Sequence, residues 1–129
     1  MSATEQFAGS RIDVVDVESD GWTAVCSLDR LTPDRGVAAL VDGQAVAVFL
    51  LADGALHAID NIDPISGASI LSRGLIGDVD GAPTVASPMY KQRFELTSGR
   101  CLDAPDVAVR VHDVGTCGDI VHVRLQSSP

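Results

Sequence analysis

Two Asp-Gly pairs divide the first half of the chain into short apolar runs. Asp42-Gly43 separates residues 36–41 from residues 44–51, and Asp53-Gly54 separates that second run from residues 55–61. Asp-Gly pairs favour two-residue hairpin turns, because both central positions of a type I′ turn need positive φ. This part of the chain is therefore predicted to form an antiparallel meander of short strands. The run at 44–51 is apolar on both faces, so it is predicted to be a central strand.

The rest of the chain carries the same kind of pattern. Further strands are predicted from apolar or alternating runs at residues 22–26, 93–96, 107–112 and 121–125. The stretch from Ile62 to Pro83 contains four glycines and two prolines, and it is predicted as one long loop of functional importance. No stretch shows a long helical period, so the expected fold is an all-β sandwich or barrel.

Length and charge limit the organisation and the partners. The 129 residues are enough for one domain, assigned to residues 21–125, while residues 1–20 are expected to be a mobile tail and 126–129 a short C-terminal tail. The net charge of −9 argues against nucleic acid and anionic membranes as partners. Without a signal peptide or an apolar run that spans a bilayer, the protein is expected in the cytoplasm.

Two short motifs resemble the paired loops of a Rieske iron–sulfur domain. They are Asn61-Ile62-Asp63-Pro64 and Ala86-Ser87-Pro88-Met89-Tyr90. In such a domain Cys-x-His and Cys-x-x-His hold a [2Fe–2S] cluster through thiolate and imidazole ligands. The resemblance places Asn61, Asp63, Ser87 and Tyr90 at those four positions, where they offer only oxygen and amide groups. It implies a Rieske-like ferredoxin fold, with two long loops at one tip, that carries no cluster.

A longer match indicates a narrower family. The segments Ile70–Asp78 and Ala86–Phe94 resemble the small subunit of assimilatory NADH-dependent nitrite reductase, as do Gln44–Phe49 and Thr97–Leu102. The resemblance implies a cofactor-free subunit of a nitrate-assimilation oxidoreductase, inactive alone. Its expected partner is the large catalytic subunit, which would carry FAD, a [4Fe–4S] cluster and sirohaem and reduce nitrite to ammonium.

Two other functions are compatible with the same fold. One is a Rieske ferredoxin that carries electrons to an oxygenase, although the missing ligands argue against it. The other is a stand-alone binding module that has reused the scaffold. Independent catalysis has weak support, because Ser87 has no base nearby in the sequence, and the close carboxylates Asp60 and Asp63 suit a turn better than acid–base work. His57, His112 and His122 are expected to be surface or hydrogen-bonded histidines rather than metal ligands, with His112 and His122 on the polar faces of their strands.

The tip also carries a small basic and aromatic cluster. Lys91 is the only lysine in the chain, and it lies beside Tyr90 and Arg93, with Arg73 following the other loop. Tyrosine and arginine are common anchors of protein interfaces, so these four residues are predicted to dock onto the large subunit. The alternative is that Lys91 and Arg93 point outward from a strand while Tyr90 packs between the loops. In that arrangement Tyr90 fills the space of the lost cluster, and Asn61 and Asp63 bond to Ser87, Tyr90 or loop amides.

Overall fold

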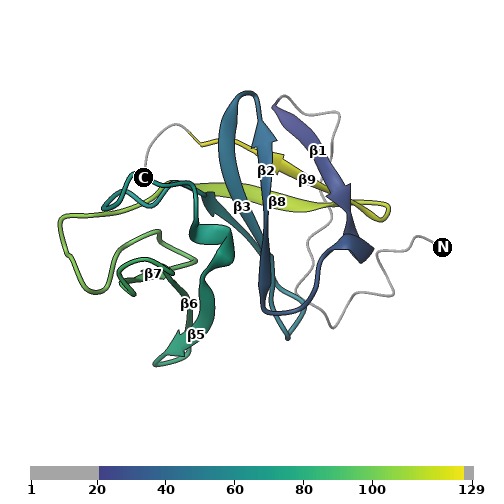
Figure 1. Ribbon diagram of the computed structural model, residues 1–129. Coiled ribbons are helices and arrows are strands. Elements are labelled where there is room, and N and C mark those ends of the chain that lie inside the picture. The colour runs from purple at the N-terminus through teal and green to yellow at the C-terminus, as the bar shows by residue number, and fades with distance from the viewer. Residues whose placement is uncertain (1–20, 127–129) are drawn as a thin grey trace.

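The computed structural model describes residues 21–126, and they fold almost entirely into strands (Figure 1). The tail predicted at residues 1–20 and the end of the tail predicted at 126–129 lie outside the described residues. Both helices within 21–126, η2 (Leu28–Arg30) and η3 (Leu71–Arg73), are single turns that are too short to cross a membrane. The strands are β1 (Trp22–Ser27), β2 (Arg35–Val41), β3 (Gln44–Leu50), β4 (Leu56–Asp60), β5 (Leu75–Val79), β6 (Ala82–Ala86), β7 (Arg93–Glu95), β8 (Val111–Cys117) and β9 (Ile120–Arg124).

The strands form two antiparallel sheets. The larger has the order β1-β9-β8-β4-β3-β2, and its end strands β1 and β2 contact each other, so that the sheet is nearly closed into a barrel. The smaller has the order β5-β6-β7 and lies to one side of the larger sheet (Figure 1). The prediction of an all-β sandwich or barrel is confirmed.

The predicted meander is present at β2, β3 and β4. Val41 pairs with Gln44 across the first turn, where Asp42 has a φ of 49° and Gly43 a φ of 80°. Both central residues therefore adopt the left-handed conformation that a type I′ turn requires. The side chains of residues 46–49 in β3 are fully buried, so this strand is central, as its apolar sequence predicts.

Two sequence predictions of strand positions are wrong. The stretch from Ile62 to Pro83 is not one loop, because β5 and β6 form a hairpin around Asp80-Gly81. Pro83 is tolerated in β6 because its backbone groups face β7, where its carbonyl oxygen accepts a hydrogen bond from the Leu96 amide at 2.9 Å. The strand predicted at 107–112 begins only at Val111, and residues before it are held by an isolated bridge between Arg100 and Ala108.

A shared apolar core joins the two sheets. The larger sheet contributes Phe49 and Ile59, and the smaller contributes Val85 and Phe94, all fully buried in one cluster with Leu71 of η3. A second cluster fills the interior of the larger sheet, with Val41, Val46, Val48, Ala58, Val121 and Val123 at its centre. The core thus fixes the smaller sheet, and both of its flanking loops, against the barrel.

Two glycines allow η3 to lie close to both sheets. A Cβ atom on Gly74 would lie 2.3 Å from the carbonyl oxygen of Ala86, and one on Gly36 would lie 2.5 Å from that of Ser72. Real side chains do not tolerate these approaches, so the absence of a side chain at both positions sets the spacing. This close packing brings the end of the loop after β4 next to the loop after β6.

Candidate functional site: the loop tip

The candidate site consists of two loops that meet at one end of the smaller sheet. The first loop (residues 61–70) connects β4 to η3, and the second loop (residues 87–92) connects β6 to β7. We call them together the loop tip. They contain the four positions that the sequence assigns to lost cluster ligands, and the structure buries Asn61, Asp63 and Ser87 but not Tyr90.

Asn61 closes the first loop on itself. Its Oδ1 accepts a hydrogen bond from the Ser72 amide at 2.7 Å, and its Nδ2 donates to Ser69 Oγ at 2.8 Å. Its carbonyl oxygen also accepts bonds from the amides of Ile70 and Leu71, at 3.0 and 2.9 Å. Every polar group of this buried side chain is therefore used to hold the loop against η3.

Asp63 ties the two loops together. Its side chain is 0% exposed, and its Oδ2 accepts a hydrogen bond of 2.6 Å from the Ser87 hydroxyl of the second loop. Its Oδ1 accepts a bond of 2.8 Å from the Ile65 amide within the first loop. The predicted bonds from Asp63 to Ser87 and to loop amides are confirmed, so a hydrogen-bonded carboxylate joins the loops.

Gln92 completes this connection, and the sequence analysis missed it. Its Nε2 lies 3.0 Å from each carboxylate oxygen of Asp63, and the side chain is 7% exposed. Its Oε1 is buried and has no hydrogen-bond partner among residues 21–126. The sequence signal for Gln92 is the alternation of side chains along a strand. Gln92, Phe94 and Leu96 point inward, whereas Arg93 points outward.

The electrostatics of Asp63 favour its charged form. Burial, the largest influence, raises the pKa of this carboxyl, but the Ser87 hydroxyl and the amides of Ile65 and Ser66 together bring the pKa below its ordinary value of 3.8. Asp63 is therefore an anion near neutral pH. The neighbouring Asp60 does not share a site with it, because Asp60 bonds to Arg110 and His112 instead.

Asp60 organises a separate connection from β4 to β8. Its Oδ1 accepts a bond of 2.9 Å from His112 Nε2, while His112 Nδ1 accepts one of 3.0 Å from the Gln126 amide. The His112 side chain is fully buried, so the expectation that it would lie on the polar face is wrong, whereas the expectation of a hydrogen-bonded histidine is confirmed. Burial raises the pKa of Asp60, but the bonds from His112 and Arg110 outweigh it and lower the pKa. Both ring nitrogens of His112 are thus occupied in a structural role.

Tyr90 does not fill the space between the loops. Its side chain is 61% exposed, so that expectation is wrong, and Gln92 occupies the interior in its place. The two loops of the tip carry three other exposed large apolar side chains, Ile62, Ile65 and Met89. Exposed apolar side chains of this size are common at binding sites.

The predicted basic cluster is divided. Arg93 is paired with Asp103 through Nη2 and Oδ1 at 2.8 Å, and this pair brings the pKa of Asp103 to about 2. Lys91 and Arg73 are exposed, and within residues 21–126 their side chains form no ion pair. Lys91 also has a φ of 66°, which turns the second loop back toward β7. Lys91 in the second loop and Arg73 directly after the first loop, without ion pairs to residues 21–126, are therefore available to a binding partner.

The donor atoms of the loop tip do not fit a [2Fe–2S] cluster. An amide, a carboxylate, a hydroxyl and an outward-facing phenol stand at Asn61, Asp63, Ser87 and Tyr90, whereas the cluster requires thiolate and imidazole ligands. The three buried side chains are moreover engaged in hydrogen bonds. Within residues 21–126 there is no group of three or more His, Cys, Asp or Glu side chains that could hold a metal ion.

Comparison with known proteins agrees with this geometry. Residues 21–124 match the Rieske-like [2Fe-2S] domain family. The nitrite reductase (NADH) small subunit of Salmonella typhimurium is 40% identical over 104 residues, which are 80% of this chain and 96% of that protein. A solved structure from Mycobacterium tuberculosis, ascribed to an NADH-dependent nitrite reductase small subunit, is 45% identical with a TM-score of 0.79, covering 82% of this chain and 96% of that one.

Two further similarities bear on the alternatives. The nitrite reductase [NAD(P)H] large subunit of Klebsiella oxytoca is 43% identical over 93 residues, which are 72% of this chain but only 10% of that protein. The ferredoxin of carbazole 1,9a-dioxygenase from Nocardioides aromaticivorans is more distant, with 28% identity and a TM-score of 0.70 over 83% of this chain and 100% of that one. The chain is a Rieske-like domain, and it belongs to the family of NADH-dependent nitrite reductase small subunits.

Proposed function

We propose that this chain is a cofactor-free small subunit that docks onto, and supports, the large catalytic subunit of an NADH-dependent nitrite reductase. The observation that carries this proposal is the nitrite reductase [NAD(P)H] large subunit of Klebsiella oxytoca, which contains a segment similar to this chain within its own polypeptide. A domain that is fused to a partner in one organism is well placed to bind the same partner as a separate chain in another. The full-length similarity to separate small subunits supports this reading.

The chemistry of the loop tip supports a role without electron transfer by this chain. Its buried polar groups bond to one another, and none is a soft ligand. The redox groups that reduce nitrite to ammonium, proposed to be FAD, a [4Fe–4S] cluster and sirohaem, therefore belong to the large subunit. The proposed setting is nitrate assimilation in the cytoplasm.

The proposal predicts a requirement in the assembled enzyme. Nitrite-dependent NADH oxidation by the purified large subunit is expected to rise severalfold when this chain is added, and to saturate at one equivalent, as the fused relative implies. The chain alone is expected to show no activity. Unchanged rates, together with separate elution of the two proteins in gel filtration, would contradict the assignment.

The loop tip is the proposed docking surface. Its polar and aromatic part is formed by Tyr90 and Lys91 of the second loop together with Arg73 and Arg93, which lie just outside the two loops. The exposed apolar side chains of both loops complete the surface. This combination matches the composition of interface hot spots. Arg93, already paired with Asp103, would contribute at the rim of the contact.

Removing three tip side chains is expected to weaken association. The triple variant Tyr90→Ser, Lys91→Ala, Arg73→Ala should bind the large subunit about 10–100-fold less tightly, since one or two hot-spot side chains account for that range. The measurement is a titration by biolayer interferometry. The control is Arg30→Ala with Asp119→Ala, on η2 and the β8–β9 turn at the other end of the domain (Figure 1), which should bind like the wild type. Equal affinities of the two variants would reject the tip as the contact.

A further inference from the structure

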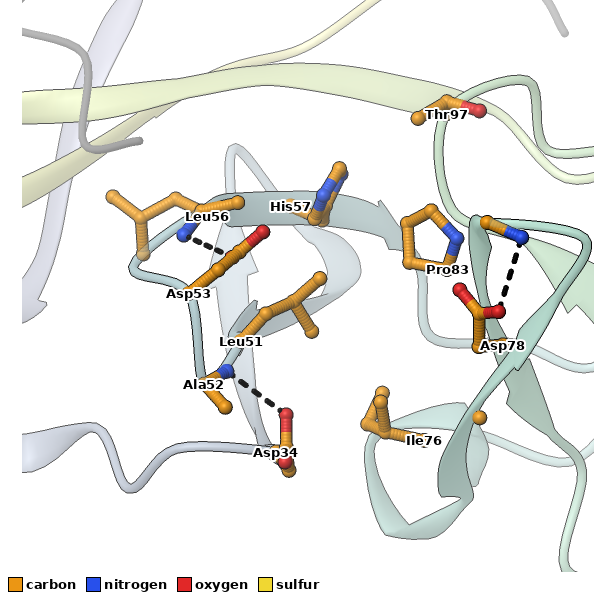
Figure 2. Close-up of a pocket in the computed structure, with 13 residues that line it drawn as sticks. Asp34, Leu51, Ala52, Asp53, Leu56, His57, Ile76, Asp78, Pro83 and Thr97 are labelled. Carbon is orange, nitrogen blue, oxygen red and sulfur yellow. Dashed lines mark hydrogen bonds between the residues drawn. The ribbon is translucent and has the colours of Figure 1, made fainter. Parts of the chain in front are cut away.

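A groove lies between the larger and the smaller sheet, beside the edge strand β5 and reaching over Pro83 of β6 and Thr97. Its wider part, of about 750 Å³, lies between residues 51–56 at the β3–β4 turn and residues 76–78 of β5. Figure 2 shows Asp34 and Leu51 on one side of this space, with Ile76, Asp78 and Pro83 opposite them. A narrower part, of about 580 Å³, continues to Arg35 and Arg73. Asp34 lines both parts, so they adjoin at this residue.

The strand that borders this groove has unpaired backbone groups. The backbone groups of Pro83 point toward β7, as its bond from the Leu96 amide shows. Asp78 lies directly opposite Pro83, and the direction of backbone groups alternates along an antiparallel strand, so those of Ile76 and Asp78 point away from β6. Among residues 21–126 only β6 pairs with β5. The amides and carbonyls of Ile76 and Asp78 thus form a free strand edge beside the groove.

The charges along the groove are unevenly placed. Arg35 and Arg73 flank its narrow part, both exposed and without an ion pair to residues 21–126, in a protein whose net charge is −9. The acid nearest to them, Asp34, uses one carboxylate oxygen to accept a bond of 3.0 Å from the Ala52 amide. The wide part carries Asp53 and Asp78. The narrow part is therefore lined by two arginines and one carboxylate, Asp34, whereas the wide part is lined by the carboxylates of Asp34, Asp53 and Asp78.

We propose that this groove receives an extended, acidic segment of the large subunit, which pairs with the free edge of β5 and places a carboxylate between Arg35 and Arg73. Guanidinium groups bind carboxylates through paired hydrogen bonds, and strand addition to a free edge is a recurrent mode of peptide recognition. Asp53 and Asp78 disfavour an acid at the wide end, so the carboxylate of the segment is expected at the end that Arg35 and Arg73 line. The inference rests on the proposed function, and Arg73 makes the groove continuous with the loop tip.

The charge requirement is tested by reversing each arginine in the full chain. Binding to the large subunit is measured for Arg35→Glu, Arg73→Glu and the matched reversal Arg100→Glu, an exposed arginine outside the groove. Each groove variant is expected to bind about tenfold more weakly at low salt, with a smaller difference at high salt, whereas Arg100→Glu stays close to the wild type. Arg35→Glu tests the groove separately from the loop tip, because Arg35 is not part of the loop tip. If Arg35→Glu binds the large subunit with the same affinity as Arg100→Glu, the inference is overturned. Absence of binding by the wild type would instead overturn the proposed function.

The strand pairing is tested by amide hydrogen exchange followed by NMR. The Ile76 and Asp78 amides are expected to exchange rapidly in the free chain and at least tenfold more slowly in the complex. Slowing confined to the loop tip would exclude strand addition at β5. Slow exchange of both amides in the free chain, lost when residues 1–20 are deleted, would identify the chain's own N-terminal segment as the occupant and would also overturn the inference.

Discussion

Replacing Asp63 with alanine is expected to destabilise the domain by about 3–4 kcal/mol, because the Ser87 hydroxyl and the Gln92 amide would each lose their buried acceptor at about 1–3 kcal/mol apiece. Both groups lie in the interior of the loop tip, where water does not replace the carboxylate. The measurement is urea unfolding followed by circular dichroism. A loss below about 0.5 kcal/mol, the range of ordinary surface substitutions, would contradict the role of Asp63 as the tie between the loops.

Asp63→Asn is the matched control, because it keeps the shape of the side chain and removes the charge. It should cost about 1–2 kcal/mol, since one carbonyl oxygen remains as acceptor and Ser87 can accept from the new amide. The pH dependence of stability separates the loss of the charge from the loss of hydrogen-bond acceptors. The pKa of Asp63 is lower in the folded state than its ordinary value of 3.8, so its contribution is complete above that value and is lost as the pH falls through the folded pKa. Asp63→Asn should therefore flatten the loss of stability in acid below about pH 4.

Truncation of Phe94 to alanine is expected to cost about 3–5 kcal/mol, the usual range for a buried phenylalanine. Phe94 is fully buried in the cluster that joins the two sheets, next to Phe49 and Val85. It also follows Gln92 on the same inward face, so its loss should loosen the second loop as well as the core.

Phe94→Leu provides the comparison, since it retains most of the apolar volume and should cost less than about 1.5 kcal/mol. Unfolding midpoints in urea report the stability, and amide exchange of residues 87–92 reports the loop. Equal destabilisation by both substitutions would show that the cost arises from the shape of the site rather than from the cavity. If amide exchange of residues 87–92 is unchanged in Phe94→Ala, the packing of Phe94 does not hold the second loop in place.

Much of the larger sheet could be predicted because its signals are local. Asp42-Gly43 specifies a tight turn regardless of distant contacts, and the apolar run of β3 indicates a central strand. The same turn signal stands at Asp80-Gly81, yet the hairpin there was missed because the surrounding glycines and Pro83 suggest a loop. Pro83 is compatible with a strand only because its backbone groups face β7, and that orientation is a property of the assembled sheet.

The interior of the loop tip was predictable only in part. The resemblance of the two motifs to Rieske loops places Asn61, Asp63 and Ser87 together, and their polar side chains predict the bond between Asp63 and Ser87. The sequence does not predict which of the two side chains, Tyr90 or Gln92, lies in the interior. The choice depends on the turn at Lys91, where a φ of 66° reverses the loop and directs Tyr90 outward and Gln92 inward. A left-handed lysine has no clear sequence signal, because glycine or asparagine usually takes such positions.

The hydrogen bond between Asp63 and Ser87 has a consequence for how the subunit matures. A tip closed by a metal cluster is finished only after delivery of iron and sulfide, and its charge changes whenever the cluster gains an electron. Here the tie consists of groups that the polypeptide already carries. The closure of the tip is therefore complete as soon as the chain has folded, and the hydrogen bonds that close it require neither a supply of iron nor a particular redox state of a cluster.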